Sequence, residues 1–136
     1  MIPAVLKVLP LVVAALALSA SGCGGTVSAD ETIAIHFSSF QPGTITVSAG
    51  VPVTITLRND DPIEHEWIVG PPGVHERHRT GTEPFHAGVP TEVTIPALST
   101  RTTELTFDTA GEFEFICHLP GHEEYGMVGT LIVTDG

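Results

Sequence analysis

The segment Phe113-Glu-Phe-Ile-Cys-His-Leu-Pro-Gly-His-Glu-Glu-Tyr-Gly-Met127 carries the most informative spacing in this chain of 136 residues. It places Cys117, His122 and Met127 in one short loop, in the pattern C-x4-H-x4-M. A thiolate, an imidazole and a thioether are donors that copper prefers, and two His, one Cys and a weak axial Met form the blue-copper pattern. The segment supplies three of these four ligands, so a second histidine must come from elsewhere. The alternative is a chance grouping of a buried Cys, a loop His and a core Met.

The alternation of apolar and polar residues around His65 selects the second histidine. Ile63, His65 and Trp67 alternate with glutamates, so His65 lies on the inward face of a predicted strand. A single histidine on an inward face is more often an ordinary core residue. Here the Cys-His-Met loop needs one further imidazole to complete the copper ligands, and this favours His65 as a ligand. His118 follows Cys117, so alternation turns it away from the site, and we expect a supporting or surface residue there. Asn59 ends the preceding strand; it either ties the ligand segments together or is an ordinary turn residue.

The whole chain after residue 30 has an apolar period of two, with turn residues every eight to twelve positions. The pattern predicts about eight short strands, including one with Ile33, Ile35 and Phe37 facing inward, and no helix. Residues 70–90 show no period. Such spacing is typical of an all-β protein, an antiparallel two-sheet sandwich or barrel.

The first 22 residues are typical of a signal peptide. Lys7 precedes an apolar run from Val8 to Leu18, which is too short for a comfortable membrane span. The small residues before Cys23 resemble a bacterial lipoprotein signal, which predicts lipidation of Cys23, a tether over 23–30 and a folded domain over 31–136. A plain signal peptide or an uncleaved anchor is the alternative. A disulfide between Cys23 and Cys117 is the other structural use of the two cysteines.

The formal charge of −11 argues against nucleic acid and anionic lipid headgroups as partners. It is compatible with a basic protein partner, although solubility alone would also account for it. The length leaves room for one domain.

The segments Phe40–Val47, Val53–Ile55, Asn59–Asp61, Glu64–His65, Cys117–His122 and Gly126–Met127 resemble a cupredoxin of the plastocyanin–azurin type. The C-x4-H-x4-M spacing is most similar to auracyanin- and rusticyanin-like members. The resemblance covers nearly all of residues 31–134. It implies a Greek-key β-sandwich with one type 1 copper per chain, ligated by His65, Cys117, His122 and Met127. It also implies that His122 lies near the surface, where electrons enter and leave.

The region 70–90 departs from the smallest cupredoxins and carries three histidines. An H-x2-H pair, His75 and His78, together with His86, predicts a second metal site, although solvated loop histidines are the commoner outcome.

These observations lead to the hypothesis of an exported, lipid-anchored, monomeric blue-copper protein that carries single electrons between redox proteins such as cytochromes or oxidases. It would act outside the cytoplasmic membrane and transform no substrate. A copper-binding module for storage, sensing or delivery is the main alternative. A copper enzyme would need further copper centres and domains that this length cannot hold.

Overall fold

The computed structural model describes residues 28–83 and 88–136, so the expected signal peptide and Cys23 lie outside the described residues. Within the described ranges the chain forms nine strands and one helix. In chain order these are β1 (Ala29–Ile35), β2 (Phe40–Gln41), β3 (Thr44–Ser48), β4 (Val53–Asn59), β5 (His65–Gly70), α1 (Pro72–Thr80), β6 (Glu92–Ile95), β7 (Thr100–Leu105), β8 (Gly111–Ile116) and β9 (Val128–Thr134). Strand β1 begins two residues before the expected domain boundary at Glu31.

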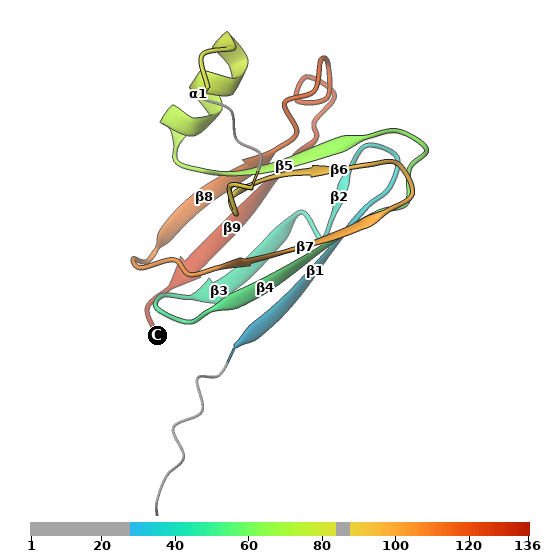
Figure 1. Ribbon diagram of the computed structural model, residues 1–136. Coiled ribbons are helices and arrows are strands. Elements are labelled where there is room, and N and C mark those ends of the chain that lie inside the picture. Colours follow the sequence, from blue (N-terminus) through green and yellow to red (C-terminus); the bar gives the residue numbers. More distant parts are fainter. Residues whose placement is uncertain (1–27, 84–87) are drawn as a thin grey trace, which may run out of the picture.

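The strands form two sheets that pack face to face (Figure 1). One sheet has the order β2-β1-β4-β7 and the other the order β3-β9-β8-β5-β6. This arrangement confirms the predicted Greek-key β-sandwich. The expectation of an entirely antiparallel sandwich is wrong, because β1 pairs with β4 and β3 pairs with β9 in parallel. Both parallel pairs join strands that are connected through the opposite sheet or over a long stretch of chain, which periodicity along one strand cannot reveal.

The core lies between the sheets and is built from the apolar residues that alternate along the strands. Ile55 and Leu57 of β4 face Trp67 of β5 and Phe115 of β8, and all four side chains are fully buried. The ring of Phe115 lies 6.0 Å from that of Trp67, centroid to centroid. Burial of such side chains stabilises a fold by about 1.5–3 kcal/mol each, so this part of the molecule forms a firm base for the loops that leave it.

Helix α1 contradicts the expectation that residues 70–90 lack regular structure. Its ends carry ordinary helix signals: Pro72 stands in the first turn, and Gly81 ends the helix with a left-handed φ of 64°. Its last turn carries Arg77, His78 and Arg79. The helix has no apolar stripe, which is why a search for apolar periodicity misses it.

Two apolar residues that were expected to point inward are exposed. Phe37 is 83% exposed and Ile63 is 47% exposed, because each lies just outside its strand in a tight turn. Phe37 and the next residue, Ser38, both have φ near 52°, a backbone region that residues with a side chain seldom adopt. Some interaction must therefore hold this turn.

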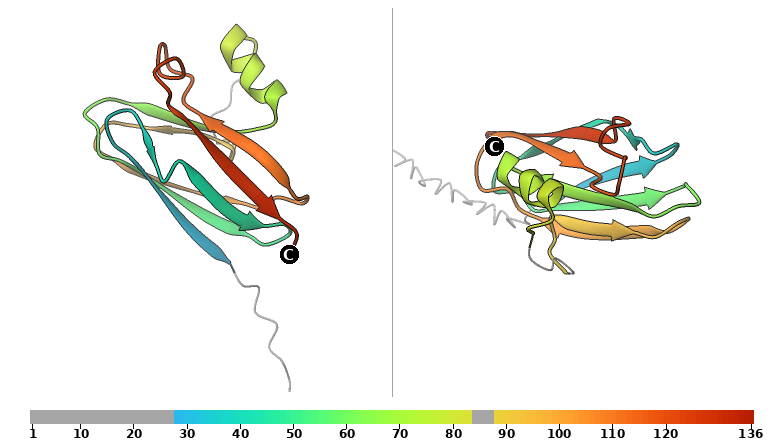
Figure 2. Two further views of the ribbon diagram at one scale, coloured as in Figure 1. Left: turned by 180° about the vertical axis from the view of Figure 1, so that it is seen from behind. Right: turned by 90° about the horizontal axis from the view of Figure 1, so that it is seen from above.

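Helix α1 and the loop that joins β8 to β9 lie at the same end of the sandwich, and the C-terminus lies at the opposite end (Figures 1 and 2). Strand β5 begins at His65, so the predicted ligand segments belong to neighbouring strands of one sheet. Among the described residues, none of the helical structure is long and apolar enough to span a membrane.

Candidate metal centre

The loop between β8 and β9 is closed by backbone hydrogen bonds at its base. The Cys117 N–H donates to the Met127 carbonyl at 3.2 Å, and the Met127 N–H donates to the His122 carbonyl at 3.0 Å. Gly121 and Gly126 have φ of 84° and 92°, so these two turns of the loop need glycine. The three predicted ligands in the loop are therefore fixed by the pairing of β8 with β9.

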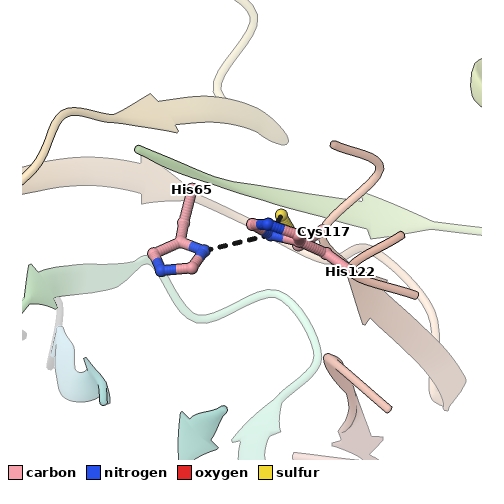
Figure 3. Close-up of side chains that lie close together, drawn as sticks. All are labelled: His65, Cys117 and His122. Atoms are coloured by element: carbon pink, nitrogen blue, oxygen red, sulfur yellow. Dashed lines mark hydrogen bonds between the residues drawn. The ribbon is translucent and has the colours of Figure 1, made fainter. Parts of the chain in front are cut away.

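Three donor atoms converge at the end of the sandwich (Figure 3). Nδ1 of His65 lies 3.2 Å from Nδ1 of His122, and Sγ of Cys117 also lies 3.2 Å from Nδ1 of His122. The three ligand atoms all lie within 4.8 Å of one another. His65 and Cys117 are fully buried, and His122 is partly exposed.

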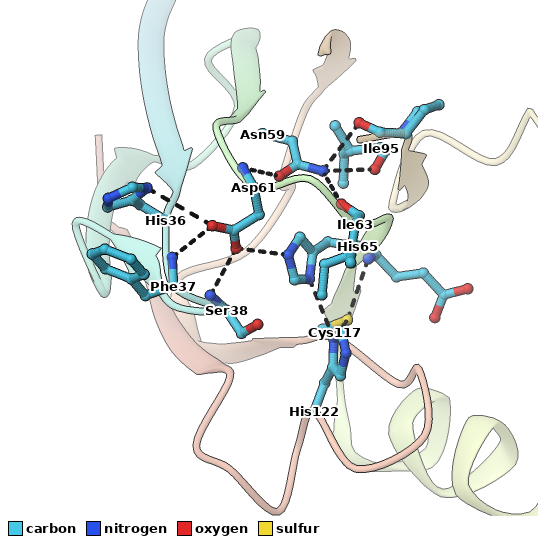
Figure 4. A network of polar contacts seen from close by, with 12 residues as sticks. His36, Phe37, Ser38, Asn59, Asp61, Ile63, His65, Ile95, Cys117 and His122 are labelled. Carbon is cyan, nitrogen blue, oxygen red and sulfur yellow. Dashed lines mark hydrogen bonds and ion pairs between the residues drawn. The ribbon is translucent and has the colours of Figure 1, made fainter. Parts of the chain in front are cut away.

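Asp61 fixes the orientation of His65. Its Oδ2 lies 2.9 Å from Nε2 of His65, which places the ring proton on Nε2 because a carboxylate only accepts (Figure 4). The lone pair of Nδ1 then points at His122 and Cys117. A carboxylate behind a histidine in this way is the usual support for a metal-binding imidazole.

The same carboxylate holds the strained turn of the opposite sheet. The N–H groups of Phe37 and Ser38 both donate to Asp61, each at 2.7 Å. Burial raises the pKa of Asp61, but these two bonds and the one to His65 outweigh it and lower the pKa below its usual value. Asp61 is therefore an ionised link between the turn after β1 and the start of β5.

Asn59 has a structural role in the turn that precedes His65. Its Nδ2 donates to the carbonyls of Ile63, Ile95 and Pro96, and its Oδ1 accepts from the Asp61 N–H at 3.0 Å. It thus joins the turn to β6, and none of these hydrogen bonds reaches the loop that contains Cys117. The bond that joins the two ligand segments is instead the Glu66 N–H to Sγ of Cys117, at 3.3 Å.

Burial also sets the protonation of the site. It raises the pKa of the Cys117 thiol, and the N–H groups of Glu66 and Leu119 oppose this only in part. Burial, followed by the proximity of His65, lowers the pKa of His122. Cys117 and His122 are therefore neutral at neutral pH, and the thiol must lose its proton before it can ligate a metal.

Met127 lies at the closing end of the loop and is fully buried in the core. Its role as the fourth ligand stays a prediction.

The other histidines that were considered as metal ligands have different surroundings. His75 and His78 lie on α1 and are not solvated, since His75 is 1% exposed and the side chain of His78 is 3% exposed. His86 lies outside the described residues. His118 points away from the Cys117 site, as expected, but it is not a surface residue: its side chain is 4% exposed and contacts His75.

Residues 8–133 match the family model for the cupredoxin-like domain. The chain belongs to the cupredoxin-like family. The relatives include a protein named copper-resistant cuproprotein CopI from Rubrivivax gelatinosus, 35% identical over 117 residues, which cover 81% of this chain and 70% of that protein. A CopI from Pseudomonas aeruginosa is 27% identical, over 69% of this cupredoxin and 70% of that protein. Auracyanin-A from Chloroflexus aurantiacus is 31% identical, over 88% and 90%.

Solved structures agree with the cupredoxin fold. Auracyanin A, described as a "blue" copper protein from a green thermophilic photosynthetic bacterium, superposes with a TM-score of 0.65 and covers 79% of this chain and 100% of that chain at 23% identity. An auracyanin from Roseiflexus castenholzii gives a TM-score of 0.64 at 19% identity, over 77% and 96%. These findings confirm the predicted family and its auracyanin-like relationship.

Two features of this cupredoxin escaped the sequence interpretation. Asp61 has the pattern of a turn residue before a proline, and only the structure shows that its carboxylate contacts both His65 and the distant N–H groups of Phe37 and Ser38. The ion pair of Arg79 with Glu123, at 2.6 Å, joins α1 to the ligand loop and depends on a helix that the pattern did not predict. The pair Pro72 and Gly81 was the available signal for that helix.

We expect Asp61→Asn to lower the free energy of unfolding of the metal-free protein by about 2 kcal/mol at neutral pH, because an amide cannot accept both N–H bonds and the His65 bond. The folded pKa of Asp61 is lowered, so its stabilisation is present above the unfolded pKa of about 4 and is lost as the pH falls through the folded value. The gap between wild type and variant should therefore shrink on acidification. Urea unfolding at several pH values measures it.

Asp60→Asn is the matched control. The side chain of Asp60 is 40% exposed and pairs with Arg58, so its replacement should cost less than about 1 kcal/mol. Equal losses in the two variants, or a gap that does not change with pH, would contradict the role of Asp61.

Proposed function

We propose that this cupredoxin carries single electrons by means of one copper ion per chain, held by His65, Cys117 and His122 with Met127 as a weaker fourth ligand. The observation that carries the proposal is the convergence of two imidazole nitrogens and one sulfur within 4.8 Å of one another. This donor set suits copper and matches the blue-copper pattern. Copper, when bound, would supply one-electron chemistry by changing between its two common oxidation states.

The protein's contribution is to keep the donors in place. His65 is held by Asp61, Cys117 by the Glu66 N–H, and the loop by the pairing of β8 and β9. Ligands fixed by packing rearrange little when the charge of the site changes, and a small rearrangement favours fast electron transfer. His122 is the partly exposed member of the set, so we propose that electrons enter and leave through its ring.

We further propose that the chain works outside the cytoplasmic membrane, anchored through a lipid on Cys23 and monomeric. The support is the sequence pattern of residues 1–22 and the small residues before Cys23. The partners would be redox proteins, and the charge of −11 favours a partner with a basic docking surface. No substrate would be transformed, and nucleic acid is disfavoured as a partner by the same charge.

A second candidate function is the binding of copper for tolerance or delivery. It is favoured by one specific observation, namely that two relatives are named copper-resistant cuproproteins. Voltammetry together with a competing chelator separates the two functions. A carrier gives a reversible one-electron wave and retains its copper, whereas a delivery protein gives no reversible wave and releases copper to the chelator.

The proposed site predicts a strong visible absorption band from Cys117 to Cu(II) in the copper-loaded protein. Cys117→Ser should abolish the band, because a hydroxyl is not the soft donor that the site needs, while circular dichroism still reports a β protein. His36→Gln is the control: the side chain of His36 is 45% exposed and approaches the support of the site only at 3.8 Å, the distance from its Nδ1 to Oδ1 of Asp61, so this variant should keep the colour. A colourless wild type, or a coloured Cys117→Ser, would rule out the proposed site.

Replacement of Met127 tests the fourth ligand. Met127→Leu should keep the visible band and raise the reduction potential, because loss of a weak donor disfavours the oxidised metal. Met127→Gln should lower the potential through a harder oxygen donor. Both potentials are measured by voltammetry. If neither variant differs from wild type, Met127 is not a ligand.

A further inference from the structure

A second group of histidines lies beside the first site, between α1 and the ligand loop. Strand alternation points His118 away from Cys117 and toward the helix. His75 and His118 approach each other from opposite sides, with Nδ1 of His75 at 3.0 Å from Nε2 of His118. The ring of His78 stacks on that of His118 with an interplanar angle of 20°. All three side chains are almost completely buried.

The backbone fixes the tautomer of His75. Nε2 of His75 lies 3.2 Å from the carbonyl oxygen of Glu114 on β8. A carbonyl oxygen only accepts, so the proton of the neutral ring is on Nε2. Nδ1 of His75 therefore directs a lone pair at His118.

A carboxylate favours the matching tautomer of His118. Nδ1 of His118 faces Oε2 of Glu123 at 3.4 Å, and Glu123 is itself held by Arg79 through Nε and an Nη atom, at 2.6–3.1 Å. The carboxylate also only accepts, so it favours a proton on Nδ1 of His118 and a lone pair on Nε2. Two lone pairs then face each other, and a metal ion or a shared proton between the rings would bind both.

We propose that His75 and His118 form a second metal site, which binds a divalent late transition-metal ion such as Zn²⁺ or Cu²⁺. Imidazole is a preferred ligand of these ions. The separation of 3.0 Å between the two ring nitrogens is close to the 3.2 Å between those of His65 and His122 in the first site. The Glu114 carbonyl and the Glu123 carboxylate bind the far nitrogens, as the supporting groups of metal-binding histidines do.

The site also has a route to solvent. A depression of about 400 Å³ is lined by His78, Arg79, His118, Glu123 and Glu124, together with the loop residues 119–121. An ion and its remaining water ligands can enter through it. Within the described residues, the structure brings His118 to His75. His86 lies outside the described residues, so the set of His75, His78 and His86 stays a prediction.

In the test, the first site is loaded with one equivalent of copper, and the protein is then titrated with Zn²⁺. The visible band reports the occupancy of the first site, and elemental analysis after dialysis reports the total metal bound. Wild type should bind one copper and one zinc, and His75→Gln should bind copper alone with the same spectrum. Glu123→Gln should weaken zinc binding about 10–100-fold, because His118 loses its supporting carboxylate. Glu112→Gln removes the same charge from an exposed residue near the start of β8, away from this site, and should leave zinc binding unchanged.

A second measurement covers the case in which a variant fails to fold. Ring-nitrogen NMR shifts of the metal-free wild type should show protonated Nε2 in His75 and protonated Nδ1 in His118. A proton on Nε2 of His118, with no additional zinc bound, would mean a plain hydrogen bond between two neutral rings and would overturn the proposal. So would equal zinc binding by wild type and His75→Gln. Failure of the first site is distinguishable, because it removes the visible band, and a Cys117→Ser chain should still bind one zinc at the second site.

Discussion

The pairing of β8 with both β9 and β5 is the constraint on which the site depends. Its register with β9 brings Cys117 and Met127 together at the base of one loop, and β5 lies on its other side with His65 at the same end. A change in this register would move Cys117, Met127 and His65 apart. The sheet thus sets the positions of Cys117, Met127 and His65 before any metal is bound, as the proposed electron carrier requires.

The opposite sheet contributes through a single carboxylate. Asp61 accepts two N–H bonds from the strained turn after β1 and binds the far nitrogen of His65. Positive φ at Phe37 and Ser38 costs of the order of 1–3 kcal/mol each, and the two bonds to Asp61 offset this cost. The turn and the orientation of His65 therefore depend on the same ionised group. Asp61 therefore both connects the turn after β1 to the start of β5 and orients the ring of His65.

The sequence predicted those features that follow from spacing along one strand. Alternation placed His65 and Cys117 on an inward face, and the C-x4-H-x4-M loop indicated the family. Contacts between distant segments could not be predicted: Asp61 has the pattern of an ordinary turn residue, and its bonds to Phe37 and Ser38 join segments more than twenty residues apart. Helix α1 was missed because its residues are polar, and its ends carry the only signals, Pro72 and Gly81. The partner of His75 was missed for the same reason, since His118 meets it only when the helix folds over the loop.

The claim that the strands preassemble one copper site at this end of the sandwich is tested most directly by crystals of the protein loaded with one equivalent of copper. An anomalous difference map at the copper edge, compared with metal-free crystals, locates the ion and any movement of its ligands. We expect a peak among Nδ1 of His65, Nδ1 of His122 and Sγ of Cys117, with the loop from Cys117 to Met127 in the same conformation in both crystals. No peak at this position, or a loop that refolds when copper binds, would contradict the claim.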